Sequence, residues 1–360
     1  MPVSTLEGRV LTTRDLAMTT DLSPRHAAVL EAVVRRFIVA GQPVGSGTVA
    51  GDLPEAVSSA TVRNVMADLE RLGYLAQPHT SAGRRPTARG YVAYVHHLME
   101  HGPLQRIDED RIRERLDAAQ PELEALLQRA CSVLSEMTRQ VGLVLAPSPA
   151  ETSILHVDLV RQGREHVSVV FVTSGGMVHT RTIAFDEEAP DGDLEAAASF
   201  LMRLSEGRTL RQLREFIAGG APPASRLELL AFRLMQRSLG ETIDESTVLV
   251  EGTFRLLDSP ELAERASLPA ILATFEERRQ LGRLLTQCGM RPGPQVLIGR
   301  DRLPESLGGC ALVAAGYRSG SRPLGVLGVF GPARMEYQRT IPMVETMARV
   351  TSDIVTRLCA

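Results

Sequence analysis

The chain has no lysine and no tryptophan. All 40 basic residues among its 360 are arginine, whose planar guanidinium group pairs bidentately with phosphate and with guanine. A GC-rich genome is the simplest explanation of an all-arginine complement, so the choice of arginine alone assigns no function. Aromatic residues make up only 4% of the chain, which leaves few of the rings that usually line small-molecule pockets.

The sequence also lacks the signals of several protein classes. Its cysteines (Cys131, Cys288, Cys310 and Cys359) include no C-x-x-C pair, so neither a disulfide framework nor a zinc site is indicated. No apolar run approaches the roughly 18–20 residues of a membrane span, and the N-terminus lacks a signal-peptide pattern. No G-x-S-x-G, H-E-x-x-H or P-loop motif is present. We therefore expect a cytoplasmic protein that is not an enzyme and has neither a metal nor a cofactor.

The charge is unevenly distributed. The formal net charge is −3 at pH 7, which taken alone argues against a nucleic-acid-binding protein. Between residues 58 and 95, however, five arginines occur with only two acidic residues, a local excess of three positive charges. A modest basic patch on an acidic protein fits a sequence-specific DNA-binding protein better than one that coats DNA. The arginines are Arg63, Arg71, Arg84, Arg85 and Arg89, and the acids are Asp68 and Glu70.

Residues 58–91 predict one helix followed by a short β-wing. The apolar side chains of the helix recur with the i, i+3, i+4, i+7 spacing of a half-buried helix. Ser58 or Ser59 is placed to cap its N-terminus, and Gly73 ends it. The wing tip contains Arg84-Arg85-Pro86, an unusual sequence for a hairpin tip unless it meets an anion.

Two further helices are predicted before this motif. Ser23 and Pro24 are suited to be the cap and first-turn residues of the first, and residues 46–53 predict a second, shorter helix. Three helices followed by a two-stranded wing form the winged type of helix-turn-helix. DNA binding is therefore predicted, although many winged helices bind only protein or lie inside larger folds.

The predicted DNA contacts fall into two groups. The start of the third helix would enter the major groove, where arginine pairs with guanine and asparagine with adenine; its residues are Ser59, Thr61, Arg63 and Asn64. The wing would hold phosphates or the minor groove through His79, Thr80, Ser81, Arg84, Arg85 and Thr87. A single winged-helix domain of this size buries too little surface on DNA to recognise a unique site tightly. Two copies are therefore expected on an inverted repeat.

Three stretches resemble one bacterial family. They are PVGSGTVAGDL, SSATVRNVMADLERLGYLAQPHTSAGRRPTARGYVAYV and, far downstream, GPARMEY. Together they resemble the HrcA family of heat-inducible transcription repressors, over about residues 22 to 358. The resemblance implies a winged-helix DNA reader, a GAF-like domain and a dimerising domain inserted into it. It also implies a homodimer that represses chaperone operons through an inverted-repeat operator on double-stranded DNA, is released on heat stress and is kept active by the GroEL chaperonin.

The predicted fold is therefore an α+β multidomain protein. Residues 1–20 are expected to be disordered or to precede the native start, and residues 21–102 to form the winged helix-turn-helix domain. Strand patterns between residues 141 and 185 place the first part of the GAF-like α/β domain at residues 103–190. An acidic Pro/Gly junction and the helical pattern after it place the inserted, helix-rich dimerisation domain at residues 191–288, and the sheet resumes in residues 289–360.

A second function remains open at this point. The chain could be a winged-helix regulator that senses a small molecule through its GAF-like domain. A thermal shift produced by a metabolite or nucleotide would favour that alternative.

Overall fold

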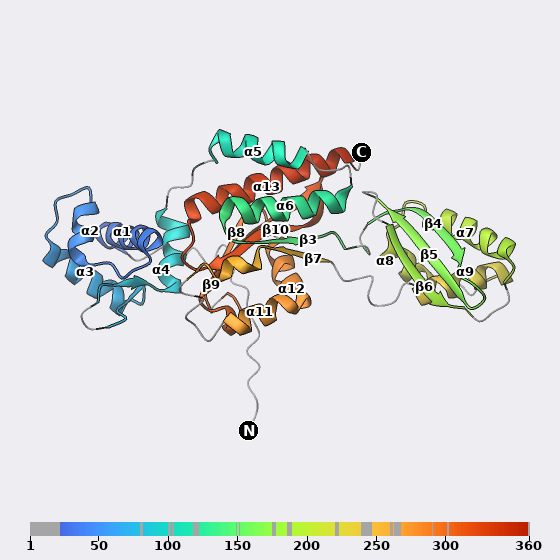
Figure 1. Cartoon of the computed structure of the whole chain (residues 1–360), viewed down its shortest axis with the longest axis horizontal. Helices are drawn as coiled ribbons and strands as arrows, with labels where there is room; N and C mark the ends of the chain where they lie inside the picture. Colours follow the sequence, from blue (N-terminus) through green and yellow to red (C-terminus); the bar gives the residue numbers. More distant parts are fainter. Residues whose placement is uncertain are drawn as a thin grey trace, which may run out of the picture.

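The protein consists of three bodies arranged in a row. Its structure is a computed structural model that describes residues 22–358 except for 80–81, 100–101, 103, 118–121, 149, 151, 175–177, 186–188, 220–222, 239–246, 260–261, 263–267, 290 and 301. We call the bodies the N-terminal unit (residues 22–99), the central unit (residues 104–148 and 247–358) and the inserted unit (residues 150–238). Figure 1 shows the central unit between the other two. The predicted disorder of residues 1–20 lies outside the described residues.

The N-terminal unit has the predicted order of three helices followed by a two-stranded ladder. Its first helix starts where the sequence predicts, because the Ser23 hydroxyl accepts a hydrogen bond from the His26 N–H at 3.3 Å. That helix ends at Gly41, whose φ of +68° suits glycine. The elements are α1 (Pro24–Ala40), α2 (Ser46–Asp52), α3 (Ser59–Arg71), β1 (Leu75–Ala76), β2 (Arg85–Pro86), α4 (Ala88–Ala93) and the π-helix η1 (Tyr94–Leu98).

The central unit is built on a five-stranded antiparallel sheet with the strand order β7-β3-β10-β9-β8. In chain order its strands are β3 (Val141–Leu145), β7 (Val248–Glu251), β8 (Gln295–Ile298), β9 (Cys310–Ser319) and β10 (Arg322–Pro332). One face carries α6 (Leu123–Thr138) and α13 (Tyr337–Leu358), with α5 (Arg106–Asp117) outside them. The other face carries α11 (Leu268–Glu276) and α12 (Arg278–Gly289), together with the short helices η4 (Thr253–Leu256) and η5 (Glu305–Leu307).

Helices cover both faces of this sheet, so successive side chains of its central strands enter two different cores. Val144 of β3 packs with the residues of α6 and α13, whereas its neighbours Leu143 and Leu145 pack with those of α11 and α12. In β9, Val313 and Leu312 are divided between the two cores in the same way. Burial on both faces explains why β3 reads as an unbroken apolar run in the sequence.

The inserted unit has its own sheet and its own core. Its strands β4 (Ile154–Arg161), β5 (His166–Thr173) and β6 (Val178–Ala184) pair antiparallel in that order. Its helices are α7 (Asp191–Ser205), α8 (Leu210–Gly219) and α9 (Arg226–Ser238), and their apolar faces pack with the sheet into one cluster. The chain leaves the central sheet at Leu145 and returns at Val248, and these two residues are register partners in the β3–β7 pair.

The predicted limits of the insertion, residues 191–288, are therefore wrong at both ends. The sequence pattern places the strands between residues 154 and 184 in the central sheet, but they form a separate three-stranded sheet. The pattern places the segment from β7 to α12 in the insertion, but that segment packs on the central sheet. Alternation within a strand predicts that it is half-buried and does not say which sheet it joins, because sheet membership depends on partners far away in the chain.

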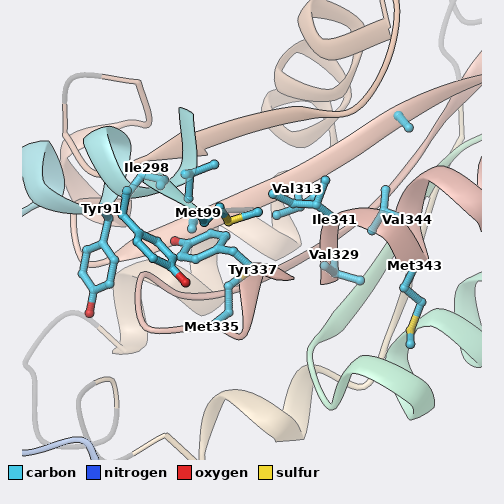
Figure 2. Packing of buried hydrophobic residues seen from close by; sticks show 14 of the residues in the cluster. Tyr91, Met99, Ile298, Val313, Val329, Met335, Tyr337, Ile341, Met343 and Val344 are labelled. Atoms are coloured by element: carbon cyan, nitrogen blue, oxygen red, sulfur yellow. The ribbon is translucent and has the colours of Figure 1, made fainter. Parts of the chain in front are cut away.

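A continuous apolar core joins the N-terminal unit to the central unit. Figure 2 shows Tyr91 and Met99, near the end of the N-terminal unit, beside Met335 and Tyr337 of the central unit. The rings of Tyr91 and Tyr337 lie 6.2 Å apart between centroids. The Tyr337 hydroxyl donates to the Ala333 carbonyl at 2.7 Å, and burial raises the pKa of Tyr337 well above its usual value. The N-terminal and central units are thus packed together.

No described helix has the length and apolarity of a membrane span.

Candidate nucleic-acid interface

A side-chain cap fixes the start of α3. The Ser58 hydroxyl accepts a hydrogen bond from the Thr61 N–H at 3.1 Å and lies 2.9 Å from the Thr61 hydroxyl. Of the two serines predicted as the cap, Ser58 takes that role and Ser59 is the first helical residue. This leaves the Ser59 side chain exposed on the first turn, while the Thr61 hydroxyl faces the cap.

The two faces of α3 have opposite character. One face is buried in the core of the N-terminal unit through Val62, Val65, Met66 and Leu69. The opposite face exposes Ser59, Arg63 and Asn64. Because residues four positions apart lie above one another on a helix, Ser59 and Arg63 share one strip of surface, and Asn64 extends it. Three of the four residues predicted to enter the major groove therefore lie together on an open surface.

The β-ladder behind α3 is held to the loop before α2. The Val44 N–H donates to the Arg84 carbonyl at 2.8 Å, and the Arg84 N–H donates to the Val44 carbonyl at 2.9 Å. The two segments of the chain approach so closely at Gly83 that an added Cβ would lie 2.4 Å from the Val44 carbonyl oxygen. Glycine is therefore required there, and the close contact fixes the position of Arg85 in β2.

Two of the five arginines predicted to form the basic patch are ion-paired. The Arg84 Nε donates to the Glu70 carboxylate at 2.9 Å, and the Arg84 side chain is only 17% exposed. Arg71 pairs with Asp68 three residues earlier on α3. These pairs use both acidic residues of the patch, so each cancels one positive charge locally. The prediction that Arg84 contacts phosphate therefore requires it to share its charge with Glu70.

A third arginine has a structural role. The Arg89 guanidinium donates to the Leu72 carbonyl at 2.9 Å and lies 4.5 Å from the centroid of the Tyr74 ring. It thus ties α4 to the end of α3. The remaining two arginines, Arg63 on α3 and Arg85 on β2, are exposed and make no ion pair with any residue that the structure describes.

The other predicted wing residues differ in their availability. The Thr87 hydroxyl donates to the carbonyls of Gly73 and Tyr74, at 2.7 and 3.1 Å, and accepts from the Gly90 N–H at 3.2 Å. Thr87 therefore caps α4, and its contact with phosphate stays a prediction. His79 is exposed. Thr80 and Ser81 lie outside the described residues.

Arg85 also borders a cavity between the N-terminal and central units. The cavity has a volume of about 270 Å³, and its lining includes Phe37, Tyr91, Gly308 and Arg334. The Arg334 guanidinium donates to the Ile38 carbonyl of α1 at 2.9 Å. This contact joins residues that are 296 positions apart in the chain. No local pattern could have revealed it.

The residues do not indicate catalysis or metal binding. Burial raises the pKa of Cys131 to about 12 and that of Cys288 to about 11, so neither thiol is a nucleophile at neutral pH. Among the described residues no group of three or more His, Cys, Asp and Glu side chains is arranged to hold a metal ion.

Comparisons with known proteins span all three units. The family described as HrcA protein C terminal domain matches residues 124–341. The chain is similar to the heat-inducible transcription repressor HrcA of Geobacter sulfurreducens, with 35% identity over 93% of this chain and 98% of the relative. That of Syntrophobacter fumaroxidans is also 35% identical, over 93% of this chain and 97% of the relative. A crystal structure of a hypothetical protein at 2.2 Å resolution aligns with a TM-score of 0.60 and 26% identity, covering 94% of this chain and 99% of that chain.

Proposed function

Because the chain belongs to the HrcA family of heat-inducible transcription repressors, we propose that it represses chaperone operons by binding, as a dimer, to an inverted-repeat operator in their promoters. Repression of transcription is the function of the family, and it is not an enzymatic activity.

One observation carries the DNA-binding proposal: the exposed strip of Ser59, Arg63 and Asn64 on α3. It is joined by Arg85 on β2, which is exposed and makes no ion pair with any described residue. Arginine and asparagine are the side chains that read guanine and adenine through paired hydrogen bonds in the major groove. An unpaired arginine outside the helix suits a backbone phosphate. We therefore assign the N-terminal unit as a winged helix-turn-helix domain in which α3 reads bases and the β1–β2 ladder, with His79, holds the backbone.

The proposed dimer uses the inserted unit. Of the two faces of its three-stranded sheet, one packs on α7 and α9. Val160 of β4 and Val178 of β6 are on the opposite face, and they are 41% and 61% exposed. These exposed valines, on a face that also carries polar residues such as Asp158 and Thr180, suit association with a second copy. The central unit, which carries this insertion, would be the GAF-like domain.

The response to heat is proposed on family membership alone. On that basis the protein would be cytoplasmic, would be released from its operator on heat stress and would be returned to its active state by the GroEL chaperonin. A purified dimer that kept full operator affinity well above growth temperature, reversibly and without a chaperonin, would contradict release from the operator on heat stress.

The deciding experiment is a binding titration followed by fluorescence anisotropy. Purified full-length protein is titrated into labelled promoter DNA from the organism's own chaperonin operon, and into a scrambled duplex of the same composition, at several salt concentrations. We expect tight binding to the promoter alone, with two protomers per site. Equal and weak binding to both duplexes would contradict operator recognition.

The stoichiometry needs a separate measurement. Sedimentation of the free protein would give its oligomeric state, and we expect a dimer. Val178→Asp would place a charge on the open sheet face and is expected to shift the protein towards monomer. Val39→Asp is a matched control, because Val39 is 82% exposed on α1 of another unit, and it is expected to leave the dimer intact.

A further inference from the structure

A second cleft lies where the N-terminal unit meets the central unit. It is formed by the ends of α1 and α6, the start of α13 and the residues around η4, and its volume is about 720 Å³. Small-molecule sites usually have volumes of about 300–1,000 Å³, so the cleft has room for a ligand of nucleotide size. Met335 and Met343, both visible in Figure 2, contribute to its apolar wall.

The charged side chains of this cleft are mainly arginines. Four arginines and two carboxylates line the cleft. The arginines are Arg139, Arg255, Arg334 and Arg339, and the carboxylates are those of Asp258 and Glu336. The Arg255 Nε donates to the Ser135 hydroxyl at 3.0 Å, and its guanidinium lies 5.2 Å from the centroid of the Phe254 ring. These contacts hold the guanidinium in place and leave other N–H donors for a ligand.

The remaining arginines differ in their pairing. Arg339 lies 3.7 Å from the carboxylate of Asp108, which Arg111 also approaches to 3.7 Å. Arg139 and Arg255 make no ion pair with the part of the chain that the structure describes. The cleft therefore holds at least two guanidinium groups whose charge is not neutralised by a neighbouring carboxylate.

The backbone of Arg139 is an independent sign that its side chain has a use. Arg139 has φ +55° and ψ +31°, and it is the one non-glycine residue with a positive φ among those the structure describes. It ends α6, at a position where glycine is usual because a Cβ is unfavourable in the left-handed region. Gly41 ends α1 in that conformation. Backbone strain of this kind is typically found at binding and active sites.

We propose that this cleft binds a small molecule that carries a phosphate group, and that Arg139 and Arg255 contact the phosphate. Guanidinium groups pair with phosphate and with carboxylate through two N–H donors at once. Here they project from several different elements, so the ligand must accept hydrogen bonds from several directions. A tetrahedral phosphate offers acceptors in that way within one rigid group. A carboxylate offers them only in its own plane, and the three carboxylates of citrate match the charge of a phosphate ligand without its tetrahedral geometry.

Arg334 would couple this site to the N-terminal unit. Its guanidinium donates to the Ile38 carbonyl near the end of α1, and an added Cβ at Gly41 would lie 3.2 Å from the Arg334 Cζ. The positive charge thus sits at the negative end of the α1 dipole. An anion in the cleft competes with that carbonyl for Arg334 and so changes how α1 is held. The coupling rests on the proposed DNA-binding function, whereas ligand binding itself does not.

Isothermal titration calorimetry on the full-length protein without DNA tests the binding. The probes are inorganic phosphate, inorganic pyrophosphate and a nucleoside diphosphate, with citrate as the carboxylate control, all at matched ionic strength. We expect pyrophosphate to bind at least fivefold more tightly than citrate. Tighter binding of the nucleoside diphosphate than of pyrophosphate would identify a phosphorylated metabolite as the ligand, and the reverse order would identify free phosphates. Equal binding of citrate and the phosphates would overturn the proposal.

Arg139→Gly separates binding from folding, because it removes the guanidinium and relieves the left-handed backbone together. We expect pyrophosphate affinity to fall at least fivefold while the melting temperature does not fall. Arg255→Gln, which keeps a hydrogen-bond donor near Ser135, is expected to cause a similar loss. The control is Arg300→Gln, since Arg300 lies outside the cleft and is 72% exposed. Unchanged affinity in both cleft variants, or an equal loss in the control, would overturn the assignment.

The coupling to DNA is measured separately, as promoter affinity with and without saturating pyrophosphate. We expect a change of at least threefold in the original protein and none in Arg139→Gly. A protein that binds pyrophosphate but not the promoter would contradict the proposed function and leave the ligand site standing. A protein that binds the promoter and no phosphate would overturn the ligand site and leave the proposed function standing.

Discussion

Two surfaces of this protein are rich in arginine, and they differ in how the arginines are paired. On the surface formed by α5 and α13 in the central unit, carboxylates neutralise the arginines. Glu109 binds both Arg349, at 2.8 Å, and Arg113, at 3.1 Å. The same surface contains the pairs Arg115–Glu136, Arg339–Asp108 and Arg357–Asp117. On the surface formed by α3 and β2 in the N-terminal unit, Arg63 and Arg85 have no such partner among the residues that the structure describes.

This difference supports the proposal that DNA binds the α3–β2 surface. Exposed ion pairs contribute little to stability, typically about 0–1 kcal/mol, but each removes one positive charge from the local field. The α5–α13 surface is therefore nearly neutral despite its arginines. On the α3–β2 surface the two unpaired guanidinium groups remain available to a base edge or a phosphate. Pairing, and not the number of arginines, separates the two surfaces.

The largest expected effect is that of Arg63→Ala. If Arg63 pairs with guanine, its removal should cost about 1–3 kcal/mol of operator binding and relax the choice of base at one position. Promoter and scrambled duplexes are compared by anisotropy. Arg115→Ala on the α5–α13 surface is the matched control, because Arg115 is 42% exposed and paired with Glu136 at 2.7 Å. It should leave both affinities unchanged. Equal losses on the two duplexes for Arg63→Ala would exclude base reading.

The exposed face of α3 could be predicted because it depends on local signals. The cap at Ser58, the buried positions four residues apart and the stop at Gly73 all lie within one short segment. The helix boundaries differ from the prediction by only one or two residues. Arg63 and Asn64 follow directly from that periodicity, since a buried Val62 and a buried Val65 leave them on the outer face.

Pairing and sheet membership could not be predicted, because they depend on distant partners. Arg84 and Arg85 are neighbours in the sequence, yet Arg84 reaches Glu70 and Arg85 faces outwards. Successive side chains of a strand point to opposite faces, which explains the difference. This explanation requires knowing that Arg84 and Arg85 lie beside or in a strand that pairs with β1. In the same way, β4, β5 and β6 look like strands of any sheet, and only their pairing shows that they belong to the insertion. The Arg334–Ile38 contact has no local signal at all.

A smaller effect is expected for Arg85→Ala. Its side chain is proposed to contact phosphate, so all duplexes should lose affinity alike. The slope of log affinity against log salt should fall by about one, which corresponds to roughly a threefold loss at low salt. Anisotropy titrations between about 50 and 200 mM salt measure the slope. A loss confined to the promoter would mean that Arg85 reads sequence.

Glu70→Gln turns a paired arginine into an unpaired one. It removes the carboxylate that binds Arg84 and keeps a side chain of similar size. If the ion pair with Glu70 keeps Arg84 from contacting phosphate, affinity for any duplex should rise by roughly threefold or less at low salt. The salt slope should then increase by up to about one. The half-buried pair also contributes to folding, so the melting temperature is measured in parallel. Unchanged DNA binding with an intact fold would show that Arg84 is too buried to contribute.

The smallest effect on DNA is expected for Glu109→Gln on the paired surface. Hydrogen bonds from Arg349 and then Arg113 hold the pKa of Glu109 below its ordinary value of about 4.3. A carboxyl with a lowered folded-state pKa stabilises the protein above the unfolded pKa, and that contribution is lost as the pH falls through the folded pKa. Glu109→Gln should therefore lower stability at pH 7, by about 1 kcal/mol or less because the pair is partly exposed.

The test is chemical denaturation of both proteins at pH 7 and again near pH 4. The stability difference should shrink as the original protein becomes protonated, because a protonated Glu109 resembles the glutamine that replaces it. Promoter affinity at pH 7 should be the same for both, since Glu109 lies in the central unit, away from α3 and β2. A clear gain in DNA affinity would mean that freeing Arg113 and Arg349 creates a second DNA-binding surface. In that case ion pairing on α5–α13 would keep DNA away from the central unit.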